Sequence, residues 1–131
     1  MSLSDGASEA LRHMKETREI NTVVLRRTDP GNTLVLEVEA NLTHEELLQA
    51  LPLEEPRLVV HELSFASQDG ARRHERLLIL WQPTAAEGSG PEVGYAAAHS
   101  SLMEFLADVH VHLTVEHTDQ LEYRRLVAMV S

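Results

Sequence analysis

The spacing of apolar residues along the chain predicts helices, each with one buried face. The first covers residues 4–17, and Ser4 or Asp5 can cap its first amides. The second begins with a capping box at Thr43–Glu46 and ends at Pro52. The positions expected to face the core in these two helices are Ala7, Ala10, Leu11, Met14, Leu47, Leu48 and Leu51.

Two more helices are predicted in the last third of the chain. One begins at Ser100 or Ser101, and the other is capped by Thr118. Their core-facing positions at helical spacing are Leu102, Phe105, Leu106, Val109, Tyr123, Leu126, Val127 and Val130. Met103 lies off this stripe, so we expect it to be exposed and to serve as an adaptable contact residue.

Apolar runs between these helices predict strands. The expected strands are residues 22–25, 33–38, 57–65, 76–81 and 110–115. The first two flank the turn Asp29–Asn32 and should form a hairpin. The almost continuous apolar run in the strand 76–81 is typical of the middle of a sheet. Residues 84–94 are rich in glycine and predict an exposed loop.

The order of these elements is helix, two strands, helix, two strands, helix, strand, helix. It predicts a fold of the α/β or α+β class, with a mixed central sheet of about five strands and helices on both faces. A length of 131 residues, 43% of them hydrophobic, suits one core. We therefore expect a single domain over residues 1–131.

Composition excludes several classes of protein. The chain has 11 basic and 21 acidic residues and a net charge of −10, which argues against nucleic acid or an anionic membrane as the main partner. It has no cysteine, and therefore no disulfide, thiolate zinc site or cysteine nucleophile. Its longest apolar run, Leu77–Trp81, is too short to span a bilayer, and its first residues show no signal-peptide pattern. We expect a soluble, cytoplasmic protein without membrane insertion.

Eight histidines raise the question of a metal site. His110 and His112 flank Val111 and would point the same way on a strand, within reach of Glu116 or His117. We favour a solvent-facing position for both, and we expect solvated or locally hydrogen-bonded rings for His13, His44, His61, His74 and His99. No nucleotide-binding, metalloprotease or serine-hydrolase motif is present. We predict no metal, no cofactor and no enzymatic activity, with a small metal-dependent enzyme as the hypothesis to exclude by zinc titration.

The densest basic cluster in this acidic chain is Arg72, Arg73 and Arg76, directly after the turn Asp69–Gly70. Three guanidinium groups near a hairpin tip can dock an acidic partner. The alternative is a solubilising charged loop.

Three segments occur in an informative order: Leu51-Pro-x-x-x-Pro-Arg-Leu-Val-Val60, Leu77-Leu-Ile-Leu-Trp-Gln-Pro83 and Gly94-Tyr-Ala-Ala-Ala98. With the weaker Ser4-Asp-Gly6 and Met14-Lys15, they resemble the actin-depolymerising-factor homology domain, the cofilin-like fold. Within that family the chain is most similar to glia maturation factor, through residues 45–70 and 115–121.

This resemblance implies a non-enzymatic regulator that binds the actin-related protein 2/3 complex, inhibits nucleation and dismantles filament branches. A first docking surface would combine the N-terminal segment and the long helix: Ser2, Leu3, Ser4, Asp5, Gly6, Ser101, Met103, Glu104 and Ala107. A second would combine the hairpin and the last helix: Arg72, Arg73, Arg76, Glu122 and Arg125. A phosphate on Ser2 or Ser4 would add negative charge at the first surface.

The long helix departs from the cofilin pattern. Cofilins place lysines there, whereas residues 100–109 contain Glu104 and Asp108 and no Lys or Arg. This difference favours a branch regulator over a direct actin-binding protein of cofilin, coactosin or twinfilin type, which is the alternative function. Spacing places Phe105 in the buried stripe, and the family position implies exposure. We expect a monomer associated with the cytoskeleton.

Overall fold

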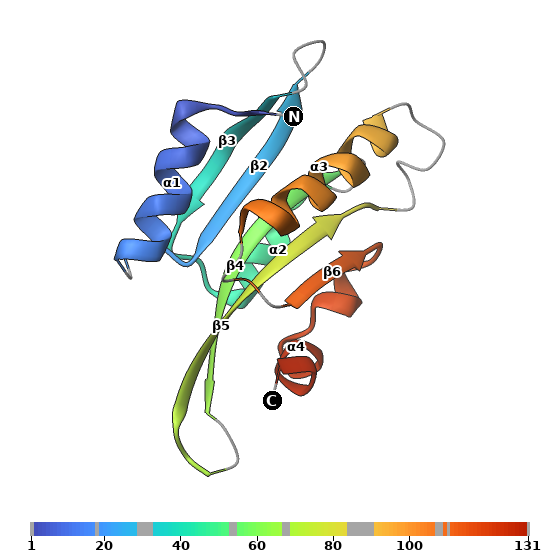
Figure 1. Cartoon of the computed structure of the whole chain (residues 1–131). Helices are drawn as coiled ribbons and strands as arrows, with labels where there is room; N and C mark the ends of the chain where they lie inside the picture. The colour runs from blue at the N-terminus through green and yellow to red at the C-terminus, as the bar shows by residue number, and fades with distance from the viewer. Residues whose placement is uncertain are drawn as a thin grey trace.

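The computed structural model describes residues 2–17, 19–28, 33–52, 55–66, 69–83, 91–106, 109 and 111–130. Within them, one mixed six-stranded sheet of order β1-β3-β2-β4-β5-β6 runs between two layers of helices (Figure 1). The strands are β1 Ser2–Leu3, β2 Thr22–Thr28, β3 Thr33–Ala40, β4 Arg57–Ala66, β5 Arg72–Trp81 and β6 Val111–Val115. The helices are α1 Asp5–Glu16, α2 His44–Ala50, α3 Pro91–Phe105, the 3₁₀ helix η2 Thr118–Leu121 and α4 Tyr123–Val130.

Local sequence signals account for the start of the first two helices. Ser4 caps α1, and its hydroxyl accepts a hydrogen bond from the amide of Ala7 at 3.1 Å. Both bonds of the predicted capping box are present at α2: the amide of Glu46 donates to the Thr43 hydroxyl, and the amide of Thr43 donates to the Glu46 carboxylate. Side-chain acceptors thus satisfy amides that a helix leaves unpaired at its first turn.

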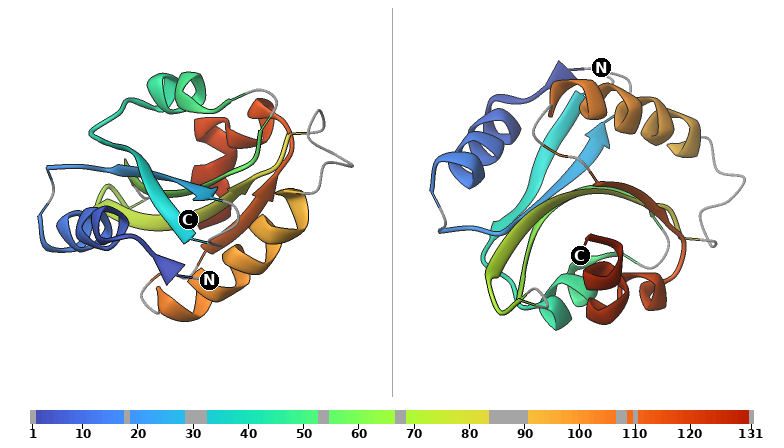
Figure 2. Two further views of the ribbon diagram at one scale, coloured as in Figure 1. Left: turned by 90° about the horizontal axis from the view of Figure 1, so that it is seen from above. Right: turned by 60° about the horizontal axis from the view of Figure 1, so that its bottom comes forward.

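Helices cover both faces of the sheet, as the sequence predicts (Figure 2, right). On one face α1 and α3 pack over alternate residues of the central strands, such as Leu58, Val60 and Leu78. On the other face α2, η2 and α4 pack over the intervening residues, such as Val59 and Ile79. The central strands are therefore apolar on both sides, which explains the almost continuous apolar run in β5.

The strands β4 and β5 extend beyond the rest of the sheet. They pair with each other over their whole length, from Arg57 and Trp81 to Ala66 and Arg72. Among the described strands, β2 contacts β4 only over residues 58–61, and β6 contacts β5 only over residues 77–81. Residues 62–66 and 72–76 therefore form a two-stranded projection, called the arm below, visible at the bottom of Figure 1.

The sequence prediction is wrong about where α3 begins and ends. Residues 91–94 belong to the helix instead of the predicted loop, and Ser100 and Ser101 lie well inside it. Proline suits the first turn of a helix as well as a loop, and a glycine inside a helix is unfavourable but tolerated, so Pro91 and Gly94 did not exclude a helix. The helix ends at Phe105 and does not continue to Val109, although Val109 is buried as predicted.

The last helix also differs from expectation. Thr118 begins the short 3₁₀ helix η2, and α4 starts separately at Tyr123. Leu126 is fully buried, as predicted, whereas Tyr123 is 43% exposed and Val127 is partly buried. Tyr123 lies at the surface because its hydroxyl bonds the carbonyl of Ser64 on β4.

Candidate functional site

The N-terminal segment is tied to the edge of the sheet. Ser2 and Leu3 form β1, which pairs in parallel with β3, and the amide of Ser4 donates to the carbonyl of Leu34 at 2.9 Å. Leu3 is half-buried and packs against the same core as α1 and α3. The backbone of this segment therefore has a defined course before any partner binds.

The exposed start of α1 and the outer side of α3 lie on the same face of the sheet (Figure 2). Asp5 and Gly6 are exposed at the first turn of α1, and Ser101 and Glu104 are exposed on α3. The structure thus brings the two parts of the predicted first surface onto one face. Ala107 lies outside the described residues, as does the side chain of Phe105.

The prediction that Met103 is exposed is wrong. It is partly buried and packs against the core beneath α3, beside the fully buried Leu102. A helix over a curved sheet has a contact stripe wide enough to include a residue next to the main stripe. The part of Met103 that remains exposed can still contribute to the rim of a contact surface.

The arm carries the arginines of the predicted second surface in two different settings. Arg72 and Arg73 are exposed near its outer end, paired across the strands with Ala66 and Phe65. Arg76 is half-buried nearer the body, where its guanidinium lies 3.9 Å from the Glu62 carboxylate. The side chain of Arg76 therefore braces the arm, and the outer positive charge comes from Arg72 and Arg73.

Contacts with α1 and α4 hold the arm. The guanidinium of Arg76 donates to the carbonyl of Met14 at 3.4 Å, next to a polar cavity of about 290 Å³ between the end of α1 and the arm. On the other side, the hydroxyl of Tyr123 donates to the carbonyl of Ser64 at 2.8 Å. This bond explains why Tyr123 is at the surface, since its hydroxyl needs a polar partner.

The bond from Tyr123 also places the start of α4 beside the arm. Glu122 and Arg125 are exposed there, on the same side of the molecule as the contact between Tyr123 and Ser64. Sequence reasoning did not identify Tyr123 or Ser64 as part of this surface. Their separation of 59 residues leaves no local signal that could have revealed the contact.

The whole sequence, residues 1–131, matches the family described as "Cofilin/tropomyosin-type actin-binding protein". The chain belongs to that family. It is 28% identical over 80 residues to actin-depolymerizing factor 5 of Oryza sativa subsp. japonica, an alignment that covers 61% of this chain and 55% of the rice protein. It is 23% identical over 124 residues to actin-depolymerizing factor 3 of Arabidopsis thaliana, covering 93% of this chain and 87% of that protein.

Solved structures show the same fold. The cofilin of Streptomyces griseoflavus superposes with a TM-score of 0.87 at 16% identity, over 100% of this chain and 98% of that one. Glia maturation factor of Caenorhabditis elegans superposes with a TM-score of 0.76 at 20% identity, over 97% and 93% of the two chains. The predicted cofilin-like fold with a mixed sheet is therefore confirmed.

Three histidines of this cofilin-family chain, His61, His99 and His112, are buried or half-buried. His61 is buried in β4, where its Nδ1 lies 3.0 Å from the Thr22 hydroxyl, and burial lowers its pKa to about 4. His99 is a buried residue of α3, and burial lowers its pKa as well. His112 is half-buried instead of solvent-facing, and His110 lies outside the described residues.

Two of the remaining histidines have the local hydrogen bonds that we expected. His74 bonds the Ser64 hydroxyl at 2.8 Å, and His13 contacts two carboxylates. Over the part of the chain that the structure describes, no three His, Cys, Asp or Glu residues are arranged to hold a metal ion. In that same part, no helix is long and apolar enough to cross a bilayer.

Proposed function

We propose that this protein is a non-enzymatic cytoskeletal regulator of the glia maturation factor type, which binds the actin-related protein 2/3 complex, inhibits nucleation and promotes debranching. The observation that carries this proposal is the charge of α3. Its described outer side presents Ser101 and Glu104, and residues 91–105 contain no Lys or Arg. A helix of this kind lacks the lysines that cofilins carry there, and an acidic helix is repelled by an acidic surface on its partner. This favours an actin-related subunit over actin itself as the partner.

The first surface would enter the groove of an actin-related subunit. The hydrogen bond from the amide of Ser4 to the carbonyl of Leu34 fixes the N-terminal segment in the unbound protein, and this reduces the ordering entropy lost on binding. The second surface, Arg72 and Arg73 with Glu122 and Arg125, would contact a neighbouring subunit. Two such surfaces on one domain would let it separate subunits that a branch junction holds together.

A direct actin-binding protein is the second candidate, favoured by two observations. Both plant relatives are named actin-depolymerizing factors, and the arm presents exposed arginines that suit an acidic filament side. In this case the arm would dominate binding, and the acidic α3 would contribute little. In both cases we propose a monomer that acts in the cytoplasm on the actin cytoskeleton.

Two assays with the same protein preparation separate these candidates. Branched filaments assembled with the actin-related protein 2/3 complex are imaged while the protein is added, and its co-sedimentation with unbranched filaments is measured without the complex. Branch loss with weak co-sedimentation supports the proposal. Strong co-sedimentation without branch loss contradicts it and supports the second candidate.

A charge reversal on α3 tests the observation itself. In Glu104→Lys, we expect branch release to become at least about threefold slower, the order of effect for a charge at the contact surface of a complex. Glu45→Lys on α2 is the matched control, because it makes the same charge change on the opposite face of the sheet. An equal effect of both variants would show that net charge, and not the α3 surface, controls the activity.

A further inference from the structure

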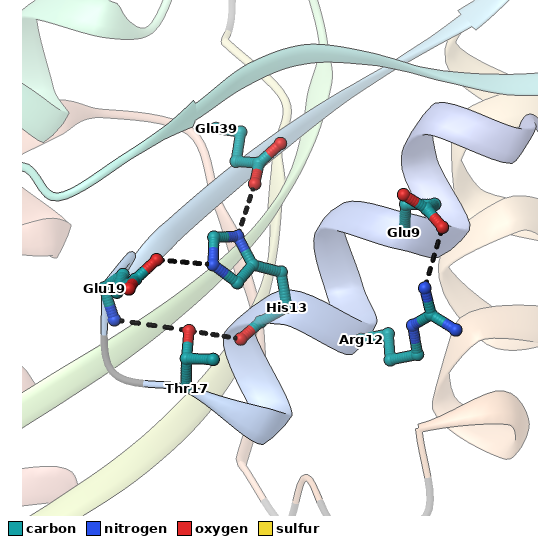
Figure 3. Close-up of polar contacts among 6 residues, drawn as sticks. All are labelled: Glu9, Arg12, His13, Thr17, Glu19 and Glu39. Carbon is teal, nitrogen blue, oxygen red and sulfur yellow. Dashed lines mark hydrogen bonds and ion pairs between the residues drawn. The ribbon is translucent and has the colours of Figure 1, made fainter.

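The imidazole ring of His13 lies between two carboxylates from different parts of the chain (Figure 3). Its Nδ1 is 2.8 Å from the carboxylate of Glu39 on β3, and its Nε2 is 2.9 Å from the carboxylate of Glu19 in the connection between α1 and β2. The ring itself belongs to the last turns of α1. One side chain thus connects three separate segments near the end of this helix.

Both contacts require a protonated ring. A carboxylate accepts hydrogen bonds, so each ring nitrogen must donate, and only the imidazolium has two N–H groups. A neutral ring has one N–H and presents a lone pair to the second carboxylate. The geometry therefore selects the charged form, and the hydrogen bonds to Glu39 and Glu19 raise the pKa of His13.

The two carboxylates differ in what they lose when the ring is neutral. The Glu39 side chain is 31% exposed, whereas that of Glu19 is 76% exposed. Water can solvate the Glu19 carboxylate almost fully. The Glu39 carboxylate is less accessible to water and depends more on a hydrogen-bond donor from the protein. The single N–H of neutral His13 will therefore stay on Nδ1, facing Glu39, and the contact with Glu19 will be lost.

We propose that His13 is a pH-sensitive clamp, which fastens the end of α1 to β3 and to the α1–β2 connection when protonated and releases the connection when neutral. The carbonyl of His13 also accepts hydrogen bonds from the amide and hydroxyl of Thr17, both at 2.9 Å, so the clamp sits where the helix ends. Its release would loosen this end of α1 and leave the rest of the helix on its apolar stripe.

The surroundings of the ring contain no competing cation among the described contacts. Glu39 and Glu19 are the charged groups that face it from the neighbouring segments, and on α1 itself Arg12 pairs with Glu9 at 2.7 Å, away from the ring (Figure 3). Because folding raises the pKa of His13 above 6.5, the stabilisation is complete below about pH 6.5. It is lost as pH rises through the raised pKa.

Hydrogen exchange and a histidine titration by NMR test the clamp in the full chain. We expect the protection factors of amides 14–17 to fall about two- to fivefold as pH rises from about 6 to about 8.5, the range for an exposed ion pair. In His13→Gln this pH dependence should vanish. His117→Gln, a change at an exposed histidine after β6, should keep the wild-type profile.

The titration separates the roles of the two carboxylates. Glu39→Gln and Glu19→Gln should each lower the midpoint of His13, because each removes one charge-assisted hydrogen bond. A wild-type midpoint at or below 6.5 would overturn the proposal. So would an unchanged midpoint in both Gln variants, or protection that depends on pH equally in His13→Gln and the wild type.

Discussion

At the scale of single residues, two histidines have pKa values that their environments shift in opposite directions. Two carboxylates raise the pKa of His13 at the surface, and burial lowers that of His61 inside β4 to about 4. The sequence carries no motif that separates the two rings. Burial decides the difference, and burial depends on which strand lies opposite: Thr22 of β2 pairs with His61 across the sheet.

The buried His61 predicts loss of stability in acid. In the unfolded chain its pKa is about 6.5, so protons bind the unfolded state first as pH falls. The free energy of unfolding should therefore decrease below pH 6.5 by up to about 3 kcal/mol near pH 4, from a pKa difference of about 2.5 units. Denaturant unfolding at several pH values measures it.

The variant His61→Gln isolates this effect from the titration of carboxylates. It should be less stable than the wild type at pH 7, because it loses packing in the core, but its stability should decline less between pH 6.5 and 4. Parallel curves for the variant and the wild type would contradict the assignment to His61. His117→Gln should follow the wild type throughout.

At the scale of elements, the helices with strong local signals were predictable and those without were not. The capping box of Thr43 and Glu46 predicts the start of α2, and Ser4 with the apolar stripe from Ala7 to Met14 predicts α1. The start of α3 carries Pro91 and Gly94, which also suit a loop, and the outer part of β5 begins with Arg72 and Arg73, which do not resemble a buried strand. These segments owe their structure to pairing and packing with distant parts of the chain.

The capping box gives a direct test of how much local signals contribute. Thr43→Ala removes the acceptor for the amide of Glu46 and should lower the free energy of unfolding by about 1 kcal/mol. Thr43→Ser keeps the hydroxyl and should remain close to the wild type. Thermal and denaturant unfolding report both changes. A loss of equal size in the serine variant would show that the methyl group, and not the cap, is responsible.

At the scale of the whole molecule, the candidate site is formed by segments that are far apart in the sequence, and no local pattern encodes their contact. Leu3 and Met103 pack against one core, and Tyr123 bonds Ser64 across 59 residues of sequence. The sequence could suggest candidate residues by resemblance, but it could not show that Arg76 braces the arm while Arg72 and Arg73 remain exposed. That division follows from the positions of Glu62 and the end of α1.

The net charge of −10 makes the position of the positive charge decisive for association. An acidic molecule that approaches an acidic partner is repelled at long range. It should therefore dock first through a part of its surface where the local charge is positive. The exposed arginines of the arm lie at the end of a projection that extends past the rest of the sheet (Figure 1). We therefore expect the arm to control the association rate with an actin-type partner.

Two charge reversals of equal size test this expectation. Arg73→Glu on the arm and Arg26→Glu on β2 both replace an exposed positive charge by a negative one. At low salt, Arg73→Glu should slow association with filaments or with the branching complex about tenfold, whereas Arg26→Glu should change it less than about twofold. The difference should shrink above about 0.1 M salt, where the screening length falls to about 10 Å. Equal slowing by both variants in stopped-flow measurements would mean that total charge governs the encounter and that the arm has no special role.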